Sequence, residues 1–558
     1  MQPMSRDVIQ SPSYLLGSFL HRIATLILVF TVSVSIDSAN CEERPTSGRV
    51  PNIVIILVDD MGYSDLGCYG GEIATPNLDR LAAGGLRFTR FYNAGRCCPT
   101  RASLLTGLYP HQAGIGGMVS GNPKRSGPYQ GYLNDHCVTI AEVLGRAGYS
   151  TYMAGKWHVG EFRPVWPADR GFDRYYGLIS GAMNYFNIRL GKRKGVVRHF
   201  AIDGEEHLPP GDGFYSTDAF TDHALEMIRK HDRQRPFFLY LAYNAPHWPL
   251  HAPQEEIEKY LGKYMDGWPK LRRSRFERMH AMGLIPDHWK LSPQDPNAAD
   301  WSRLDEAKRR EMDRKMAVYA AVIDRMDQNV GRLVELLGKQ GYLDNTLIFF
   351  LSDNGACHEG GTFGHNFRPD LTGPIGTENS YRSYGISWSN ASNTPFRRHK
   401  HWIHEGGIAT PLIVHWPAVI KGRGELRSQV GHVIDLMATC VDVARAEYPK
   451  QFDGRDIRPM EGISLRTFFD NNRTKPRTLC WEHVQNRGIR DGRWKLVAAR
   501  GGAWELYDIK ADSTELNDLV DQKRDLAEKL VGKWAAWAKR IGVKNFERLA
   551  QLRPVGGG

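Results

Sequence analysis

A strand-length run of six apolar residues, Ile53 to Val58, constrains the fold of this chain more than any other feature. Most of these residues are β-branched and none is polar, which is typical of a strand buried on both faces of a parallel sheet. A similar run, Thr346 to Leu351, lies far along the chain, and amphipathic helical patterns such as Glu311 to Leu337 lie between. The sequence therefore predicts an α/β fold with a large, mixed but mostly parallel sheet flanked by helices.

Both apolar runs end in side chains that carry oxygen. Asp59 and Asp60 follow the first run, and Asp353 and Asn354 follow the second. Open α/β sheets place ligand sites at the carboxyl ends of their strands. A single aspartate there is as consistent with a solvated turn, but two adjacent carboxylates repel each other and are better explained by a cation. The all-oxygen set suits a hard cation such as Ca²⁺ or Mg²⁺ rather than zinc.

A cysteine precedes a predicted helix between these two runs. Pro99 suits the first turn of a helix, Thr100 to Leu105 continue it, and Gly107 suits a left-handed stop. Cys97 would then lie at the helix N-terminus, where backbone N–H groups favour an anion, and Arg101 would add positive charge one turn later. A cysteine in that place is a nucleophile of low pKa, a residue that is chemically modified into another group, or simply a buried thiol.

Polar residues also follow two further predicted strands. Lys156 and His158 come after the strand Ser150 to Ala154, between two glycines and beside a tryptophan. His247 follows the strand Pro236 to Tyr243 and is held between two prolines, which fix the backbone on either side. The alternative explanation for Lys156 and His158 is that both are exposed surface residues without a chemical role. The rigid placement of His247 favours a chemical role.

The segment Cys97-Cys98-Pro99-Thr100-Arg101, followed by Leu104-Leu105-Thr106-Gly107, resembles the signature of the formylglycine-dependent sulfatases. Thr100 stands where that family more often has serine. In that family the first cysteine of the signature is oxidised to an aldehyde, which here falls on Cys97. Further blocks match in the same order: Asp59-Asp60, Gly155 to Gly160, Ala245 to Pro249, Asp353-Asn354 and Lys400. Arg397, Arg398 and His399 beside Lys400 are as consistent with surface charge.

This resemblance implies an alkaline-phosphatase-like fold and hydrolysis of a sulfate ester by the hydrated aldehyde. The implied catalytic residues are Cys97, Arg101, Lys156, His158, His247 and Lys400, and the implied ligands of Ca²⁺ or Mg²⁺ are Asp59, Asp60, Cys97, Asp353 and Asn354. Arg101 would orient the hydrate, the two lysines would bind sulfate, His247 with Lys400 would assist the departing oxygen, and His158 would take the proton that releases sulfate. Maturation would require a formylglycine-generating enzyme. A substrate-contacting serine of the family has no clear match; Ser180 and Asn184 are both candidates.

The net charge of the 558-residue chain is +11, which suits an anionic substrate but also nucleic acid or membrane surfaces. We expect no nucleic-acid partner, because no zinc-finger spacing, RNA-binding aromatic motif or basic helix is present. The aromatic, basic segment 254–308 suggests an insertion or cap near the site, or a peripheral helical embellishment. Segment 360–393 has no regular period and suggests a long functional loop. Both segments favour a sulfated sugar or polysaccharide as substrate.

The N-terminal 40 residues resemble a secretory signal peptide. Arg22 precedes an apolar run from Ile23 to Ile36, and the small residues Ser38 and Ala39 follow. An N-terminal membrane anchor is the alternative, although the run is short for a span. No other apolar run approaches spanning length, so we expect export and no stable membrane span after removal of the signal. The eight cysteines are scattered and allow one or two disulfides without indicating their pairing.

The pattern changes after residue 445. Short predicted strands at 478–482, 494–497 and 504–507 are separated by turns, and a final amphipathic helix follows. We therefore predict a catalytic domain over 50–445 and a smaller α+β domain of antiparallel strands over 446–558.

Two other functions compete with sulfate ester hydrolysis. A phosphate or phosphonate ester hydrolase of the same superfamily would carry a Ser or Thr nucleophile and histidine-rich ligands for two metals, or else share the formylglycine. A non-catalytic protein that binds sulfated glycans would be expected to lack one of the six catalytic residues, and none is absent.

Overall fold

The computed structural model describes residues 48–196 and 198–552. The predicted signal peptide, residues 1–40, lies outside the described residues. Within the described ranges, no helix is both long enough and apolar enough to cross a membrane. The seven cysteines of these ranges are all free thiols.

The helices and strands follow one another as the alternating pattern predicts. The helices are α1 Pro76–Ala83, α2 Cys97–Thr106, α3 Ile140–Arg146, α4 Ser216–Arg229, α5 Gln254–Glu258, α6 Gly267–Ala281, α7 Glu306–Lys339, α8 Gly385–Ser392, α9 Glu405–Ile408, α10 Ile434–Val443, α11 Arg524–Ile541 and α12 Phe546–Leu549. The strands are β1 Asn52–Val58, β2 Leu86–Tyr92, β3 Ser150–Gly155, β4 Arg174–Leu178, β5 Phe200–Ile202, β6 Glu205–Glu206, β7 Phe237–Ala242, β8 Thr346–Ser352, β9 Ala409–His415, β10 Glu425–Arg427, β11 Gly431–His432, β12 Gln451–Phe452, β13 Arg455–Asp456, β14 Thr478–His483, β15 Asn486–Asp491, β16 Trp494–Ala498 and β17 Glu505–Asp508. Short 3-10 helices lie at Gly67–Tyr69, Pro167–Arg170, Trp301–Arg303, Leu343–Asn345 and Arg466–Phe468.

An 11-stranded mixed sheet forms the centre of the fold. Its order is β10-β2-β9-β8-β1-β7-β3-β4-β5-β6, with β11 also paired to β2. β1 lies inside the sheet and is parallel to both neighbours, β7 and β8, and β3 is parallel to β7. β9 runs antiparallel to β8, and β5 to β4. The prediction of a large, mostly parallel sheet flanked by helices is confirmed.

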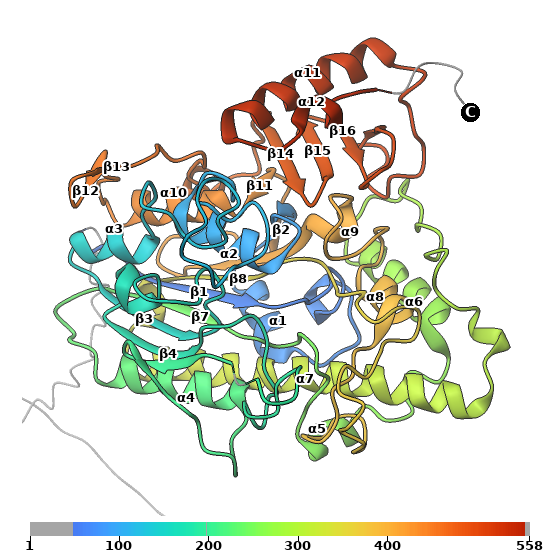
Figure 1. Cartoon of the computed structure of the whole chain (residues 1–558), viewed down its shortest axis with the longest axis horizontal. Helices are drawn as coiled ribbons and strands as arrows, with labels where there is room; N and C mark the ends of the chain where they lie inside the picture. Colours follow the sequence, from blue (N-terminus) through green and yellow to red (C-terminus); the bar gives the residue numbers. More distant parts are fainter. Residues whose placement is uncertain (1–47, 197, 553–558) are drawn as a thin grey trace, which may run out of the picture. The chain divides into compact units, whose positions relative to one another are not determined.

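Helices cover both faces of this sheet, and β1 packs against both layers. Val54, Ile56 and Val58 belong to the apolar core that includes α4 and α7, whereas the alternating residues Ile53 and Ile55 belong to the core that includes α2, α3 and α10. In Figure 1, α4 and α7 lie on one side of the sheet and α2, α3 and α10 on the other. This burial on both faces explains why the β1 sequence shows no polar alternation.

The segment 254–308 forms helices α5 and α6 and a 3-10 turn. Arg275 of α6 is fully buried, and its guanidinium bonds to the carboxylates of Asp65 at 2.6 Å and Glu72 at 2.8 Å. These ion pairs anchor α6 to the loops that follow β1. The expectation that 360–393 is wholly irregular is wrong, because α8 lies within it. All but one of the residues of α8 are buried, so its sequence shows no amphipathic period.

A separate antiparallel sheet, β14-β15-β16-β17, follows near the C-terminus, with α11 packed on it. Trp534 of α11 donates a hydrogen bond from its indole to the carbonyl of Trp481 in β14 at 3.0 Å. The three predicted strands are present, and β15 is an additional one. The described residues all fall within one compact unit. The domain boundary at residue 446 stays a prediction.

Candidate active site

The carboxyl ends of four neighbouring parallel strands meet at one edge of the central sheet. The residues that follow them are Asp353 and Asn354 after β8, Asp59 and Asp60 after β1, His247 after β7, and Lys156 and His158 after β3. Backbone bonds lock these ends together: the amide of Asp353 donates to the carbonyl of Val58 at 3.0 Å. Segments almost 300 residues apart in the chain therefore lie side by side.

Helix α2 brings Cys97 to this edge. The helix begins at Cys97 and ends before Gly107, whose φ of 69° is the left-handed stop that the sequence predicts. One turn into the helix, the fully buried Arg101 bonds to Asp353 at 2.9 Å and to the backbone carbonyl of Lys156 at 2.8 Å. Arg101 thus fastens α2 to the ends of both β8 and β3.

Three buried carboxylates and three buried cations form the centre of the site. Lys156 is hydrogen-bonded to Asp59, Lys400 lies 2.7 Å from Asp60, and Arg101 pairs with Asp353. All six side chains are nearly inaccessible to solvent. Removing any one of them would leave an uncompensated charge in the interior.

The pKa values of these groups reflect their neighbours. Burial alone would raise the pKa of Asp59, but Lys156 and other nearby cations outweigh it and hold that pKa below its usual value. Burial and the charge of Asp59 raise the pKa of Asp353 well above the ordinary range. Burial alone would lower the pKa of Lys400, yet the Asp60 carboxylate keeps it well above normal.

Cys97 and His158 form a second part of the site. The sulfur atoms of Cys97 and Cys98 and a ring nitrogen of His158 lie within 4.8 Å of one another. A hydrogen bond from Cys98, reinforced by the charge of Lys156, lowers the pKa of Cys97 well below normal. Burial lowers the pKa of His158, which favours its neutral form. A Cβ at Gly181 would come within 2.4 Å of the His158 ring, so a larger residue there would displace that ring.

His247 faces the carboxylate pair. Its Nδ1 lies against the carbonyl of Trp248 and donates a hydrogen bond there. Its Nε2 is 3.4 Å from a carboxylate oxygen of Asp60. Because Nδ1 is engaged by the backbone, Nε2 is the nitrogen that can exchange a proton within the site.

The oxygen donors of this site have the chemistry of a cation site. Ligand atoms of Asp59, Asp60 and His247 lie within 4.8 Å of one another. One carboxylate oxygen of Asp59 and the amide oxygen of Asn354 are buried without a hydrogen-bond partner among the described residues. Buried oxygens of this kind need a partner, and a hard divalent cation is one that carboxylates and amides bind well.

Residues 51–446 match the family model described as Sulfatase. The chain belongs to the sulfatase family. Residues 397–536 also match the model described as N-sulphoglucosamine sulphohydrolase, C-terminal. An arylsulfatase of Klebsiella aerogenes is 36% identical over 427 residues, covering 74% of this chain and 91% of the relative. An uncharacterized sulfatase of Schizosaccharomyces pombe is 33% identical over 485 residues, covering 81% and 86%.

Solved structures give the same fold. Ps i-CgsB, solved in complex with k-i-k-neocarrahexaose, superimposes with a TM-score of 0.67 at 25% identity, covering 90% of this chain and 100% of the other. A phosphonate monoester hydrolase of Agrobacterium radiobacter shares the fold alone, with a TM-score of 0.53 at 17% identity and coverage of 90% and 96%. The predicted family, fold and enzyme class are confirmed: the protein is a sulfatase, a hydrolase of sulfate esters.

The structure of this sulfatase gathers all the residues that the resemblance selected. Cys97, Arg101, Lys156, His158, His247, Lys400, Asp59, Asp60, Asp353 and Asn354 come from six separate segments and meet at one sheet edge. His399, next to Lys400, is not surface charge: it is buried and bonds to Asp295 at 3.0 Å. Their chemical roles are predictions and belong to the proposed function.

The two candidates for a substrate-contacting serine are engaged in local structure. The hydroxyl of Ser180 accepts a hydrogen bond from the backbone amide of His199 at 3.2 Å. The side chain of Asn184 donates to the carbonyl of Glu378 at 2.8 Å and accepts from the amides of the following turn. Both side chains therefore stabilise local structure.

Three residues beside the site were not predicted. Arg96 precedes Cys97, Trp248 follows His247, and Glu359 lies in the loop after β8. Arg96 and the indole of Trp248 both donate to the carboxylate of Glu359, at 3.0 and 2.8 Å. No sequence pattern joins them, because each comes from a different segment. For Arg96 and Trp248, their positions next to Cys97 and His247 were the one available signal, and Glu359 had none.

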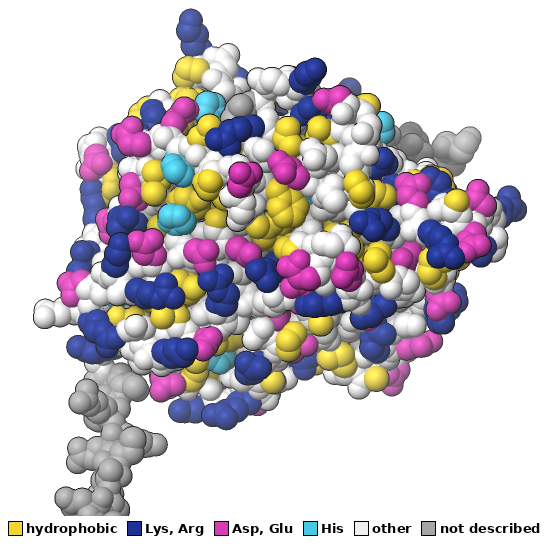
Figure 2. Space-filling view, turned by 90° about the horizontal axis from the view of Figure 1, so that it is seen from below, with side chains coloured by type: hydrophobic (Ala, Val, Ile, Leu, Met, Phe, Trp, Pro, Cys, Tyr) yellow, Lys and Arg dark blue, Asp and Glu magenta, His cyan; other side chains and the backbone are white. Residues whose placement is uncertain are grey.

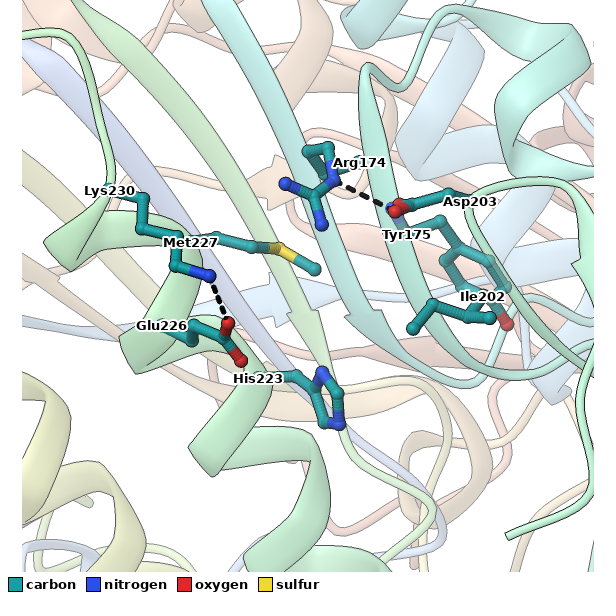
Figure 3. A pocket seen from close by; sticks show the side chains of 8 residues that line it. All are labelled: Arg174, Tyr175, Ile202, Asp203, His223, Glu226, Met227 and Lys230. Atoms are coloured by element: carbon teal, nitrogen blue, oxygen red, sulfur yellow. Dashed lines mark hydrogen bonds and ion pairs between the residues drawn. The ribbon is translucent and has the colours of Figure 1, made fainter.

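A surface hollow lies elsewhere, between α4 and strands β4 and β5 (Figure 3). Its charged residues pair with each other: Arg174 with Asp203 at 2.9 Å, and Lys230 with Glu226. Its cavity volume of about 10 Å³ holds no more than one water molecule. This hollow therefore does not compete with the sheet edge as the sulfatase site.

Proposed function

We propose that this enzyme removes sulfate from sugar or aryl sulfate esters at the cluster around Cys97, with formylglycine at position 97 and a bound Ca²⁺, or alternatively Mg²⁺. The observation that carries the proposal is the position of Cys97. It lies at the N-terminus of α2 beside His158, with the Lys156, Lys400 and Arg101 cations around the adjoining acids.

The metal ligands in this proposal are Asp59, Asp60, Asp353 and Asn354, together with the oxygen of oxidised Cys97. The unpartnered oxygens of Asp59 and Asn354 support this assignment. Crowding of Asp353 against Asp59 supports it too, since a cation would relieve their repulsion. When bound, the cation would supply Lewis-acid attraction for the oxygens of the sulfate group.

Charge balance at the site favours an anionic substrate. With Asp353 ionised, as a bound cation would favour, the carboxylates of Asp59, Asp60 and Asp353 are balanced by Lys156, Lys400 and Arg101. Addition of a divalent cation to this neutral set leaves net positive charge, which complements the single negative charge of a sulfate monoester. On the face shown in Figure 2, basic and acidic side chains are interspersed, so attraction for an anion on this face does not come from one broad basic patch.

The side chains divide the chemistry between them. Lys156 and Lys400 bind sulfate oxygens and stabilise the charge that develops there. Arg101 fixes the helix that presents residue 97. The aldehyde at position 97 would supply, as its hydrate, a hydroxyl nucleophile that a thiol cannot replace. His247 gives the proton on Nε2 to the departing alcohol oxygen, and neutral His158 accepts the proton whose removal releases sulfate.

The substrate class in this proposal is a sulfated sugar. The aromatic and basic character of 254–308 and 360–393 favours it. Support also comes from relatives: an N-acetylgalactosamine-6-sulfatase of Rattus norvegicus is 30% identical over 425 residues, covering 73% of this chain and 65% of the relative. Export through residues 1–40 and maturation by a formylglycine-generating enzyme are parts of the same proposal.

Hydrolysis of matched aryl esters tests this function. Protein co-expressed with a formylglycine-generating enzyme should release 4-nitrophenol from 4-nitrophenyl sulfate much faster than from 4-nitrophenyl phosphate or a phenylphosphonate ester, and Cys97→Ala should abolish that release. Faster turnover of the phosphorus esters would instead assign a phosphate or phosphonate hydrolase. Binding of sulfated glycans without any turnover would assign a binding protein.

A further inference from the structure

A cluster of polar residues borders the buried catalytic centre. We define the rim cluster as Arg96, Glu359 and Trp248. Each belongs to a segment that also carries a proposed catalytic residue or metal ligand: Cys97, Asp353 and His247, respectively. The side chains of Arg96 and Glu359 are 18% and 24% exposed, whereas that of Lys400 is 1% exposed. Arg96 and Glu359 are therefore partly open to solvent, unlike the buried cations of the centre.

Glu359 is held rigidly by its two partners in the rim cluster. One carboxylate oxygen accepts from Arg96 at 3.0 Å, and the other accepts from the indole of Trp248 at 2.8 Å. Arg96 is itself positioned by His401, whose Nδ1 lies 3.1 Å from its guanidinium. A carboxylate accepts about four hydrogen bonds. Two sites of Glu359 are used in these bonds, so its oxygens retain capacity for donors from outside.

A carboxylate at this place is unfavourable for binding of sulfate alone. Burial raises the pKa of Glu359, but Lys400 and Arg96 outweigh burial and hold that pKa below its usual range, so the group is anionic. A second anion next to a sulfate site repels the substrate unless the substrate offers a hydrogen-bond donor.

The position of the rim cluster relative to His247 indicates which part of the substrate it meets. Trp248 is the next residue after His247, which we have proposed as the proton donor to the departing oxygen. The rings of His247 and Trp248 are 5.1 Å apart, and Glu359 accepts the indole hydrogen bond of Trp248. Against burial, which raises the pKa of Glu359, Lys400 and His247 both lower it, so its carboxylate lies near the proposed proton donor as well as near Lys400. An aryl alcohol has no hydroxyl to offer there, whereas a sugar sulfated on a ring carbon such as C3 or C4 has one on the neighbouring carbon.

We infer that Glu359, positioned by Arg96 and Trp248, accepts a hydrogen bond from a free hydroxyl next to the sulfate ester, and that it thereby selects sulfated sugar units over aryl sulfates. This inference rests on the proposed function and names its substrate class more narrowly.

The test compares substrates in the mature, full-length enzyme. Wild-type and Glu359→Gln proteins are assayed on 4-nitrophenyl sulfate, on the 3- and 4-monosulfates of methyl galactoside and methyl glucoside, and on the best hexoside with the hydroxyl next to its sulfate removed. Glu335→Gln is the matched control, because Glu335 is exposed on α7 and pairs only with Lys339. We expect Glu359→Gln to lower kcat/KM for the hexoside sulfate by about tenfold or more relative to its effect on the aryl sulfate. The deoxy analogue should lose most of this sensitivity.

Equal losses on all three substrates would overturn the inference, because they would mean that Glu359 acts only on the structure of the site. Turnover of the aryl sulfate with no turnover of any hexoside sulfate would also overturn it and leave the proposed function standing. If no ester were hydrolysed, calorimetry would measure binding of the hexoside sulfates to Cys97→Ser protein, with and without Glu359→Gln. Binding that Glu359→Gln weakens about tenfold would support the inference. Unchanged or absent binding would overturn it.

Discussion

The guanidinium of Arg101 lies 2.9 Å from the carboxylate of Asp353, with both side chains fully buried. This contact joins the helix that begins at Cys97 to a strand end about 250 residues further along the chain. The same guanidinium reaches the backbone of Lys156 at 2.8 Å. The position of Cys97 relative to the acids therefore depends on one planar, multidentate side chain, which lysine cannot replace.

Arg101→Lys should lower kcat by about 100-fold, because the ammonium cannot bond at once to both partners and α2 shifts relative to the acids. Thermal unfolding should also begin at a lower temperature. Steady-state kinetics and calorimetry measure both effects. Arg146→Lys is the control, since Arg146 pairs with Asp453 at the exposed surface. Equal activity of the two variants would contradict the role given to Arg101.

Removal of the metal should abolish hydrolysis. Chelator-treated enzyme should regain activity with Ca²⁺ or Mg²⁺, and the ion it needs should also raise Tm, since binding at 100 times Kd stabilises the folded state by about 2.7 kcal/mol. In Asp59→Asn the rise in Tm should disappear. Elemental analysis of the purified protein gives an independent measurement. Full activity of metal-free protein would exclude the proposed cation.

The activity should persist to acid pH. His158 must be neutral to accept a proton, and the neutral form is present above its pKa and lost below it. Because burial lowers the pKa of His158, the acidic limb of the kcat profile that His158 causes should lie below pH 6.5. His158→Gln should remove this limb and leave a low, flat rate. A limb of the wild-type profile above pH 6.5 that vanishes in His158→Gln would contradict this assignment.

The buried ion cluster of Lys495 should be essential for stability. Its ammonium bonds to Glu405 at 2.6 Å and to Glu515 at 2.8 Å, and none of the three side chains is more than 2% exposed. Lys495→Ala leaves two buried carboxylates without a cation and should cost about 3–5 kcal/mol of unfolding free energy. Because α9 begins at Glu405, shortly after Lys400, activity should fall as well.

Denaturant unfolding measures this loss. Lys339→Ala, which removes an exposed ion pair with Glu335 on α7, is the matched control and should change the free energy of unfolding by less than about 0.5 kcal/mol. A loss for Lys495→Ala no greater than that of the control would contradict this prediction. It would show that the cluster does not contribute to holding the sheet of β14–β17 against α9.

Local sequence patterns predicted the strands that position the site. Residues 53–58 of β1 and 347–351 of β8 are all apolar because both faces of each strand are buried, and Asp residues follow soon after both runs. That these ends meet follows from the parallel order of the strands. By contrast, α8 has serines and an asparagine buried on all sides, and its sequence has no period to detect. Strand β15 was missed because Arg487 and Arg490 are buried and hydrogen-bonded, contrary to the usual exposure of arginine.

A residue of the site could be predicted from the sequence only where it belongs to a recognisable motif. Cys97 and Arg101 belong to one continuous signature, and Lys156 and His158 to another. Glu359 has no motif, because its importance depends on contacts with Arg96 and Trp248 that the sequence does not show. For His399 the local sequence was misleading, because a histidine in a basic run is usually exposed. It is buried because Asp295, from a distant segment, accepts a hydrogen bond from its ring.

The most direct measurement is the mass of the peptide that carries Cys97, from protein purified from its natural host. Digestion should avoid trypsin, because cleavage after Arg96 and Arg101 leaves too short a fragment. Replacement of the sulfur and two hydrogens of Cys97 by one oxygen is the result that our account predicts. An unmodified thiol in fully active enzyme would contradict it and assign the chemistry to the thiolate.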